Sequence, residues 1–303
     1  MTHPLQFGII TVQDQPWAKM VEHWKRVESL GFDSVWVADH FLNSHHPETD
    51  WFDGWTILSA LATQTSRIRL GTLVTNIIYR NPATIAKQAL TLDHISQGRL
   101  SLGIGATSDR DLSHSMTGVE NWKASERAGR FREIIEIVDQ MLRNETTTFQ
   151  GHYYNITNAR MRPSTIQKPR PPLVVAAAGE TTLKVAAKYA DTWNTYGGIN
   201  LSEDETLSII RQRSGLLDRY CAEMGRDPSE ITHSFLAGFT ADTPFASLNA
   251  FYDFVGRLQE IGITEFIFYY DYAFLPPDRC LNLEMMERVA LEAIPTLRSK
   301  EAG

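Results

Sequence analysis

Residues 67–106 read RIRLGTLVTNIIYRNPATIAKQALTLDHISQGRLSLGIGA, two short apolar runs separated by an amphipathic segment. The first run, 68–75, is rich in β-branched residues, as in strands that are buried on both faces. Pro82 suits the first turn of a helix over 83–95, and a glycine suits its end. A second apolar run, 100–104, follows at once. The stretch therefore predicts a β-α-β unit, the repeat of a parallel α/β fold.

The same alternation continues along the whole chain. The predicted strands cover 5–11, 34–38, 68–75, 100–104, 173–177, 191–195, 231–239 and 265–270. The predicted helices cover 17–30, 54–65, 83–95, 124–143, a segment beginning at 179–182, 203–224, 245–261 and 283–297. A small hairpin is expected over 147–156. Because no linker divides these eight pairs, we predict one domain over residues 1–303, a (β/α)8 TIM barrel with insertions in the loops at the C-terminal face of the barrel.

Composition excludes several classes of protein. The 303 residues are 43% hydrophobic and carry a formal charge of −7, so there is no basic surface for nucleic acid or an anionic membrane. Two cysteines cannot form a disulfide framework. The sequence MTHPLQFGII does not resemble a signal peptide, and no run of 18 apolar residues occurs. We expect a soluble cytoplasmic protein without nucleic-acid or membrane partners.

In a barrel of this kind the active site forms where the strands end. Asp39 and His40 follow the predicted strand 34–38, and a histidine at that rim can exchange protons near neutral pH. A solvated surface pair is the plain alternative. The turn at 179–182, GETT, is either a simple helix start or a seat for a phosphate group. On the helix over 124–143 we expect Glu126, Arg127, Arg130 and Glu133 to lie on the solvated face.

Other catalytic patterns are weak or absent. His45 and His46 are adjacent in sequence and cannot face one ion as a pair four residues apart on a helix would, so we expect no metal site. The nucleophile motif GxSxG does not occur. A metal-dependent barrel hydrolase is therefore a weaker alternative.

Three stretches resemble one known family. They are VWVADHF at 35–41, the whole of 67–106, and VAAKYADTWNTYGG at 185–198. Together they resemble the luciferase-like flavin-dependent oxidoreductases, which implies a (β/α)8 barrel, often dimeric, that binds FMN or the deazaflavin coenzyme F420 at its mouth. The stretches VTN…YRNP and KYADTWN are closer to the F420-dependent branch.

The resemblance implies roles for individual residues. His40 would lie beside the cofactor ring and act as the catalytic residue that transfers a proton. A non-prolyl cis peptide is implied between Leu73 and Val74, forming a bulge that supports the ring. The implied cofactor-binding residues are Asp39, His40, Leu73, Val74, Asn76, Gly105, Ala106, Ala178, Gly179, Glu180, Thr195 and Gly197. Of these, Ala178, Gly179 and Glu180 would hold the phosphate.

One loop departs from the family pattern. Many members of the F420-dependent branch continue GIGAGW with a Glu and a His soon after, whereas residues 103–118 read GIGATSDRDLSHSMTG. Ser108, Asp109 and His114 are the candidates to replace the usual contacts of this loop, or they face solvent.

The resemblance implies a function: hydride transfer between reduced F420 and a small organic substrate bound over the ring. The loops 41–53 and 108–123 are candidates for a lid that excludes water. The predicted substrate-binding residues are Trp51, Phe52, His114, Met116, Tyr269 and Tyr270, for which ordinary rim packing is the alternative. Two other functions stay open: an FMNH2-dependent two-component monooxygenase, using O2 and a separate flavin reductase, and a non-catalytic flavin-binding protein.

Overall fold

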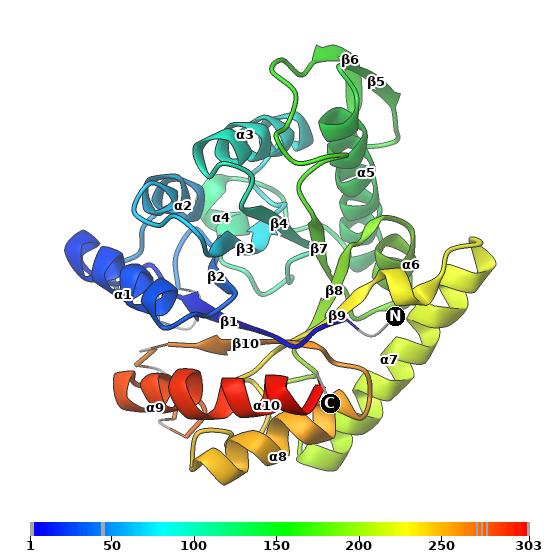
Figure 1. The fold of residues 1–303 in the computed structure, drawn as a ribbon. Helices are drawn as coiled ribbons and strands as arrows, with labels where there is room; N and C mark the ends of the chain where they lie inside the picture. The colour runs from blue at the N-terminus through cyan, green and yellow to red at the C-terminus, as the bar shows by residue number, and fades with distance from the viewer. Residues whose placement is uncertain (1–2, 44–45, 271, 274, 277, 302–303) are drawn as a thin grey trace.

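Eight parallel strands close into a barrel in the computed structural model of the chain (Figure 1). The structure describes residues 3–301 except 44, 45, 271, 274 and 277. The strands are β1 Gln6–Thr11, β2 Ser34–Val37, β3 Arg69–Asn76, β4 Leu100–Gly105, β7 Leu173–Ala176, β8 Thr192–Thr195, β9 Thr232–Leu236 and β10 Glu265–Tyr269. Their order around the barrel is β1-β10-β9-β8-β7-β4-β3-β2. The predicted (β/α)8 TIM barrel is confirmed.

Helices alternate with the strands and surround the barrel. They are α1 Trp17–Ser29, α2 Gly54–Ala62, α3 Pro82–Ile95, α5 Ala124–Arg143, α6 Glu180–Tyr189, α7 Glu203–Glu223, α8 Leu248–Gln259, α9 Leu283–Arg288 and α10 Ile294–Glu301. A π-helical segment, Val289–Ala293, joins α9 to α10, where the sequence predicts one continuous helix. None of the helices in the described part of the chain is long and apolar enough to cross a membrane.

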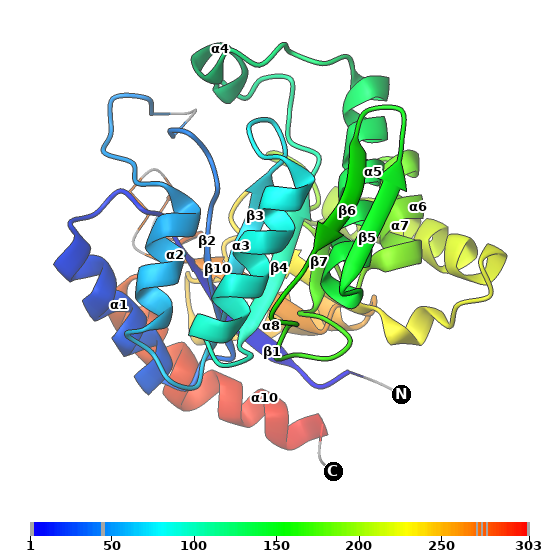
Figure 2. The ribbon, with the colours of Figure 1, turned by 90° about the horizontal axis from the view of Figure 1, so that it is seen from above.

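Two insertions depart from the plain barrel. The short helix α4, Ser113–Thr117, lies in the segment after β4, where the sequence predicts only a polar loop. The antiparallel hairpin of β5, Thr146–Gln150, and β6, Asn155–Arg160, follows α5 and confirms the predicted hairpin. In Figure 2, α4 and the loop after β2 stand at one end of the barrel and both termini lie toward the other.

Apolar side chains fill the barrel as well as the space beneath the helices. Successive strand residues point to opposite faces, so Phe7 and Ile9 of β1 pack under the helices. Ile10 belongs instead to a second buried cluster with Trp36, Val174 and Ile267 of other strands. The barrel interior is therefore a packed core, and a ligand site has to form at the rim, where the strands end.

Strand β3 bulges beside the rim. Its pairing with β4 shifts register between Thr72 and Thr75, and the intervening Leu73–Val74 bond is a cis peptide, as the family resemblance implies. The bulge carries Val74 so close to β4 that a Cβ built on Gly105 would lie 2.3 Å from Val74 Cγ2. Glycine is thus required at 105 by the approach of the neighbouring strand.

Helix α5 corrects one prediction about its surface. Arg127 and Glu133 are buried rather than solvated. The carboxylate of Glu133 accepts backbone N–H bonds from His152, Tyr153 and Tyr154 at 2.8–3.0 Å, which ties the hairpin to α5. The amphipathic spacing of α5 did not reveal the burial of Glu133, because the β5–β6 hairpin that covers it is not part of the repeating barrel unit.

Candidate active site

Two cavities meet at the C-terminal rim of the barrel. The larger has a volume of about 590 Å³ and extends toward the start of α6. The smaller has a volume of about 510 Å³ and extends under the loops that follow β2 and β10. His40, Leu73, Phe239 and Tyr269 line both. A molecule in one cavity can therefore contact a molecule in the other across His40.

His40 is held by a carboxylate from the loop after β4. Its Nδ1 lies 3.0 Å from Oδ2 of Asp111, and the amide of Asn76 donates to the same oxygen at 3.0 Å. The backbone N–H of Ser113 donates to the other oxygen at 2.8 Å. Because Asp111 accepts from Nδ1, neutral His40 carries its proton there and presents the Nε2 lone pair.

The pKa of Asp111 reflects this network. Burial by itself would raise the pKa of the carboxyl, but the hydrogen bonds from His40 and Ser113 and the positive charge of protonated His40 favour the carboxylate more strongly. The pKa lies well below its usual range, so Asp111 is an anion at neutral pH and stays a hydrogen-bond acceptor.

Asp39 does not reach either cavity, contrary to prediction. Its side chain is fully buried, and both oxygens accept from the Arg80 guanidinium at 2.7 Å. It also accepts the backbone N–H of Asn76 at 3.0 Å. Asp39 therefore fixes the ends of β2 and β3 relative to each other and supports the residues that hold His40.

Two more predicted cofactor residues lie behind the cavity wall. The amide of Asn76 is fully engaged, since its oxygen accepts from Thr107 and from the N–H of Ile78. Gly197 has φ +71° and its carbonyl accepts from Arg213 at 2.6 Å, so its role is in the turn. The predicted residues that do line the larger cavity are His40, Leu73, Val74, Gly105, Ala106, Ala178, Gly179, Glu180 and Thr195.

The far end of the larger cavity is suited to an anion. The first turn of α6 lies here, and its N–H groups have no acceptor within the helix. Arg127 of α5 lines the same cavity and is only 8% exposed. No hydrogen bond or ion pair of its side chain with a described residue is found, and Nη1 is buried without an acceptor. A buried unpaired guanidinium is costly, so this arrangement fits a ligand that brings negative charge.

Aromatic and polar side chains line the smaller cavity. Trp51 is fixed by a 2.8 Å hydrogen bond from its Nε1 to the carbonyl of His40. Tyr269 and Tyr272 stack with ring centroids 5.3 Å apart, and Asn43 donates to the hydroxyl of Tyr272. Arg279 is the cation on this wall.

Four predicted substrate residues lie elsewhere. Phe52 and Met116 are 44% and 51% exposed and line neither cavity. His114 is buried against Trp122 and bonds the carbonyl of Glu120 through Nδ1. Tyr270 is buried and packs edge-on against His23 of α1, because it points away from the rim where Tyr269 points toward it. Trp51 and Tyr269 do line the smaller cavity.

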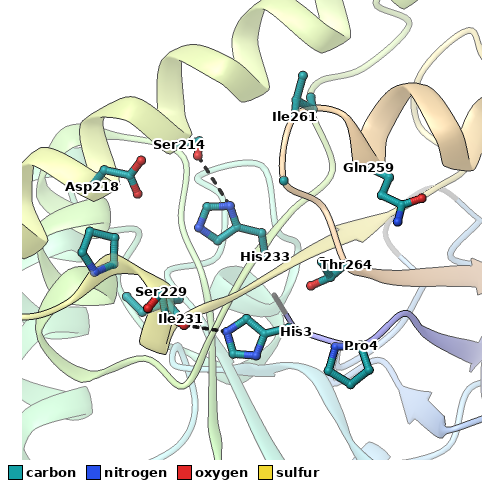
Figure 3. A pocket seen from close by; sticks show the side chains of 12 residues that line it. His3, Pro4, Ser214, Asp218, Ser229, Ile231, His233, Gln259, Ile261 and Thr264 are labelled. Atoms are coloured by element: carbon teal, nitrogen blue, oxygen red, sulfur yellow. Dashed lines mark hydrogen bonds between the residues drawn. The ribbon is translucent and has the colours of Figure 1, made fainter. Parts of the chain in front are cut away.

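A larger hollow, about 820 Å³, opens at the opposite end of the barrel (Figure 3). His233 and Ser214 face each other there, with Nδ1 and Oγ 3.5 Å apart. Burial, together with the charge of His3, lowers the pKa of His233 to about 4, so the imidazole is a weak base. So weak a base does not activate Ser214 as a nucleophile. In the described part of the chain, no three His, Cys, Asp or Glu side chains converge as a metal site would require, and His45 lies outside that part.

Comparison with known proteins identifies the family. The sequence profile described as "Luciferase-like monooxygenase" matches residues 2–271. The chain belongs to the luciferase-like monooxygenase family. Within this family, the F420-dependent glucose-6-phosphate dehydrogenase of Kineococcus radiotolerans is 33% identical over 216 residues, which are 69% of this chain and 62% of that protein.

Another relative is named as a reductase. The 5,10-methylenetetrahydromethanopterin reductase of Archaeoglobus fulgidus is 30% identical over 62% of this chain and 52% of its own length. The chain thus matches less than two thirds of the length of these relatives. An F420-dependent secondary alcohol dehydrogenase, solved with an F420–acetone adduct, has a TM-score of 0.79 at 20% identity, covering 97% of this chain and 99% of that one, and it supports the fold.

Asp111 and Arg127 are the site residues that the sequence did not reveal. The departure of 103–118 from the family pattern pointed to the right loop, but the candidates drawn from it were Ser108, Asp109 and His114. Of these, Ser108 lines the larger cavity. Arg127 sits beside Ala124 and Ala128, and this run of small residues on one helix face was the available signal that something other than side chains packs there.

Proposed function

We propose that the chain is an F420-dependent oxidoreductase that transfers a hydride between the deazaflavin and a small organic substrate. The main observation behind this proposal is the position of His40, which lines both cavities and whose Nδ1 is hydrogen-bonded to the ionised Asp111. Relatives named as F420-dependent dehydrogenases support the choice of cofactor.

The larger cavity fits a cofactor with an anionic tail. Arg127 and the first turn of α6 would hold the phosphate, and the β3 bulge at Leu73 and Val74 would support the ring. When bound, the deazaflavin supplies a carbon that accepts or donates a hydride. The fit rests on the unpaired Arg127, a cation that the described part of the chain leaves without a counter-charge.

His40 handles the proton that accompanies the hydride. In alcohol oxidation, Nε2 takes the proton of the substrate hydroxyl, and in carbonyl reduction the protonated imidazole returns it. Asp111 holds the ring orientation and stabilises the positive charge that His40 gains. Leu73, Phe239 and Tyr269 form an apolar wall at the junction, which keeps water from the reacting atoms.

The test begins with F420 and FMN titrated in parallel into the purified protein, followed by fluorescence quenching and difference spectra. We expect F420 to bind more tightly and to be reduced by an alcohol, or oxidised by a carbonyl or unsaturated compound, in the assay. His40→Gln should lower kcat by roughly 10²- to 10⁴-fold without weakening cofactor binding. His152→Gln, on the hairpin and away from both cavities, is the matched control.

Other outcomes identify the alternatives. Preference for reduced FMN with O2 consumption would favour a two-component monooxygenase, which needs a separate flavin reductase. Cofactor binding with no turnover across the substrate set would favour a non-catalytic flavin-binding protein. Sedimentation of the same sample tests the homodimer that the family resemblance implies.

A further inference from the structure

Arg279 lines the smaller cavity and has no counter-ion among the residues that the structure describes. Its Nε is buried and has no hydrogen-bond acceptor, and among the described residues its guanidinium forms no ion pair. Its position is fixed by the backbone, where the N–H of Arg279 donates to the carbonyl of Pro276 at 2.8 Å. By contrast, Arg80 at the same rim is neutralised by Asp39 and Asp53. Among the described residues, no hydrogen bond or ion pair of the Arg279 side chain indicates a structural role.

The described lining of the smaller cavity does not offset the charge of Arg279. None of the described residues that line the smaller cavity is an Asp or Glu. The other polar side chains that line this cavity belong to Asn43, His46, Asn200 and Tyr272. Asp111 does not line it and is hydrogen-bonded to His40. Nε of a guanidinium together with one Nη forms a fork that matches a carboxylate or a phosphate.

We infer that the substrate carries an oxyanion, a carboxylate or a phosphate, which Arg279 binds while the carbon that exchanges hydride lies toward His40. The inference rests on the proposed function and adds a substrate class to it. Of these two cavities, Arg279 lines only the smaller one, whereas His40 lines both. The two residues would therefore contact different parts of the substrate. Arg279 is then the residue that selects acidic substrates over neutral ones.

The first test measures anion binding directly. The protein loaded with F420 is titrated with inorganic phosphate and, separately, with propionate at constant ionic strength, and binding is followed by calorimetry. We expect saturable binding that weakens at least tenfold in Arg279→Gln, is partly restored in Arg279→Lys, and is unchanged in Arg132→Gln, an exposed arginine on α5. Equal affinity in the native protein and Arg279→Gln would overturn the inference.

Loading with cofactor matters because Arg127 offers a second anion site. If the protein binds no F420, the same titration is done in an Arg127→Met background, which removes that site. If Arg279→Gln abolishes anion binding in this background, the oxyanion site at Arg279 is supported even though the protein does not bind F420. The two ideas can therefore fail separately.

The second test compares matched substrates. The pairs are 3-hydroxybutyrate against 2-butanol and glycerol 3-phosphate against glycerol, with reduction of F420 as the readout. We expect the acidic member of at least one pair to have the higher kcat/KM, and Arg279→Gln to abolish that preference mainly through KM. Turnover of the neutral members at equal kcat/KM would overturn the inference while leaving hydride transfer intact. If no pair is turned over, the binding result decides.

Discussion

His40 and Asp111 form a hydrogen-bonded pair although they lie 71 residues apart in the chain. The pair explains how a partly exposed imidazole can have one defined tautomer. Asp111 is itself oriented by Asn76 and Ser113, so the position of the histidine depends on residues that never touch a ligand. Such supporting hydrogen bonds set the geometry that proton transfer needs.

Replacing Asp111 by Asn is expected to impair turnover without impairing cofactor binding. The amide can donate to Nδ1 and so favours the wrong tautomer of His40, and it cannot stabilise the imidazolium. We expect kcat to fall by roughly 10- to 100-fold or more, as for other residues that orient a functional histidine. Steady-state kinetics with a parallel F420 titration measures both quantities, and Asp109→Asn is the control. Unchanged kcat would remove Asp111 from the site.

Replacing Arg127 by Met should have opposite effects on the free and the cofactor-bound protein. The change removes a buried charge that has no counter-charge among the described residues, so the free protein should be more stable by about 1 kcal/mol. The same change should weaken F420 binding roughly 10- to 100-fold, since a charge-assisted contact is lost. Chemical denaturation and titration measure the two effects. Arg132→Met on the same helix is the control, and a destabilised free protein would contradict the assignment.

Helix α5 connects the hairpin insertion to the loop that carries Asp111. Glu133 binds three backbone N–H groups of the hairpin. One turn earlier, the Arg130 guanidinium stacks on Tyr153 of the hairpin and on Trp122 at 4.7 and 4.5 Å. Trp122 in turn packs against His114 of α4. Through these contacts the hairpin supports the segment after β4 from outside the barrel.

Glu133→Ala is expected to destabilise the protein by about 3 kcal/mol. Three N–H groups would lose a charged acceptor, and each such bond contributes about 1.5–3 kcal/mol with incomplete additivity. The free energy of unfolding in urea measures the loss, and Glu22→Ala on the exposed face of α1 controls for loss of a surface carboxylate. A change below about 1 kcal/mol would show that the hairpin is held by its apolar contacts instead.

The two ends of the barrel differ in chemistry. The C-terminal end holds the two cavities that meet at His40, whereas the other end has the separate hollow beside His233 and ion pairs such as that of Arg298 of α10 with Asp33, 2.5 Å apart. Glu265, at the start of β10, is buried near this end. Burial, together with the negative charge of Asp33, raises its pKa to about 7 against the opposing effects of Ser234 and Arg69.

The raised pKa of Glu265 predicts a pH dependence of stability. Between the unfolded pKa near 4.5 and the folded pKa of about 7, the folded state retains a proton that the unfolded state has lost. The free energy of unfolding should therefore fall as pH rises through this window of 2.5 units, by roughly 3–3.5 kcal/mol at about 1.4 kcal/mol per unit.

Comparison with Glu265→Gln isolates this effect. The amide cannot ionise, so the stability difference between the native protein and the variant should shift in favour of the variant from pH 5 to pH 8. His233, whose lowered pKa makes stability rise with pH below about 6.5, titrates in both proteins and cancels. Urea denaturation at the two pH values is the measurement, and a pH-independent difference would contradict the raised pKa.

The barrel and its rim were predictable from residues that act locally. The alternation of apolar runs with amphipathic segments predicts eight strand–helix pairs, and parallel strands with helical crossovers close in only a few ways. The rule that strand ends build the site selected His40, and the family resemblance added the Leu73–Val74 cis peptide. The structure places Asp39 and Asn76 outside the described cavity linings, because position at a strand end does not specify which way a side chain turns, and it places Gly197 in a turn.

The sequence by itself thus determined the barrel, the family and the position of His40, because periodicity and motifs are properties of neighbouring residues. Only the tertiary structure decided that Asp111 binds His40 and that Arg127 is buried in the larger cavity beside α6. It also decided that Arg279 lines the smaller cavity with no Asp or Glu among the described lining residues. Burial and charge pairing depend on segments distant in the chain. The loops that bring these residues together have no periodic sequence pattern, so their course cannot be predicted from the sequence.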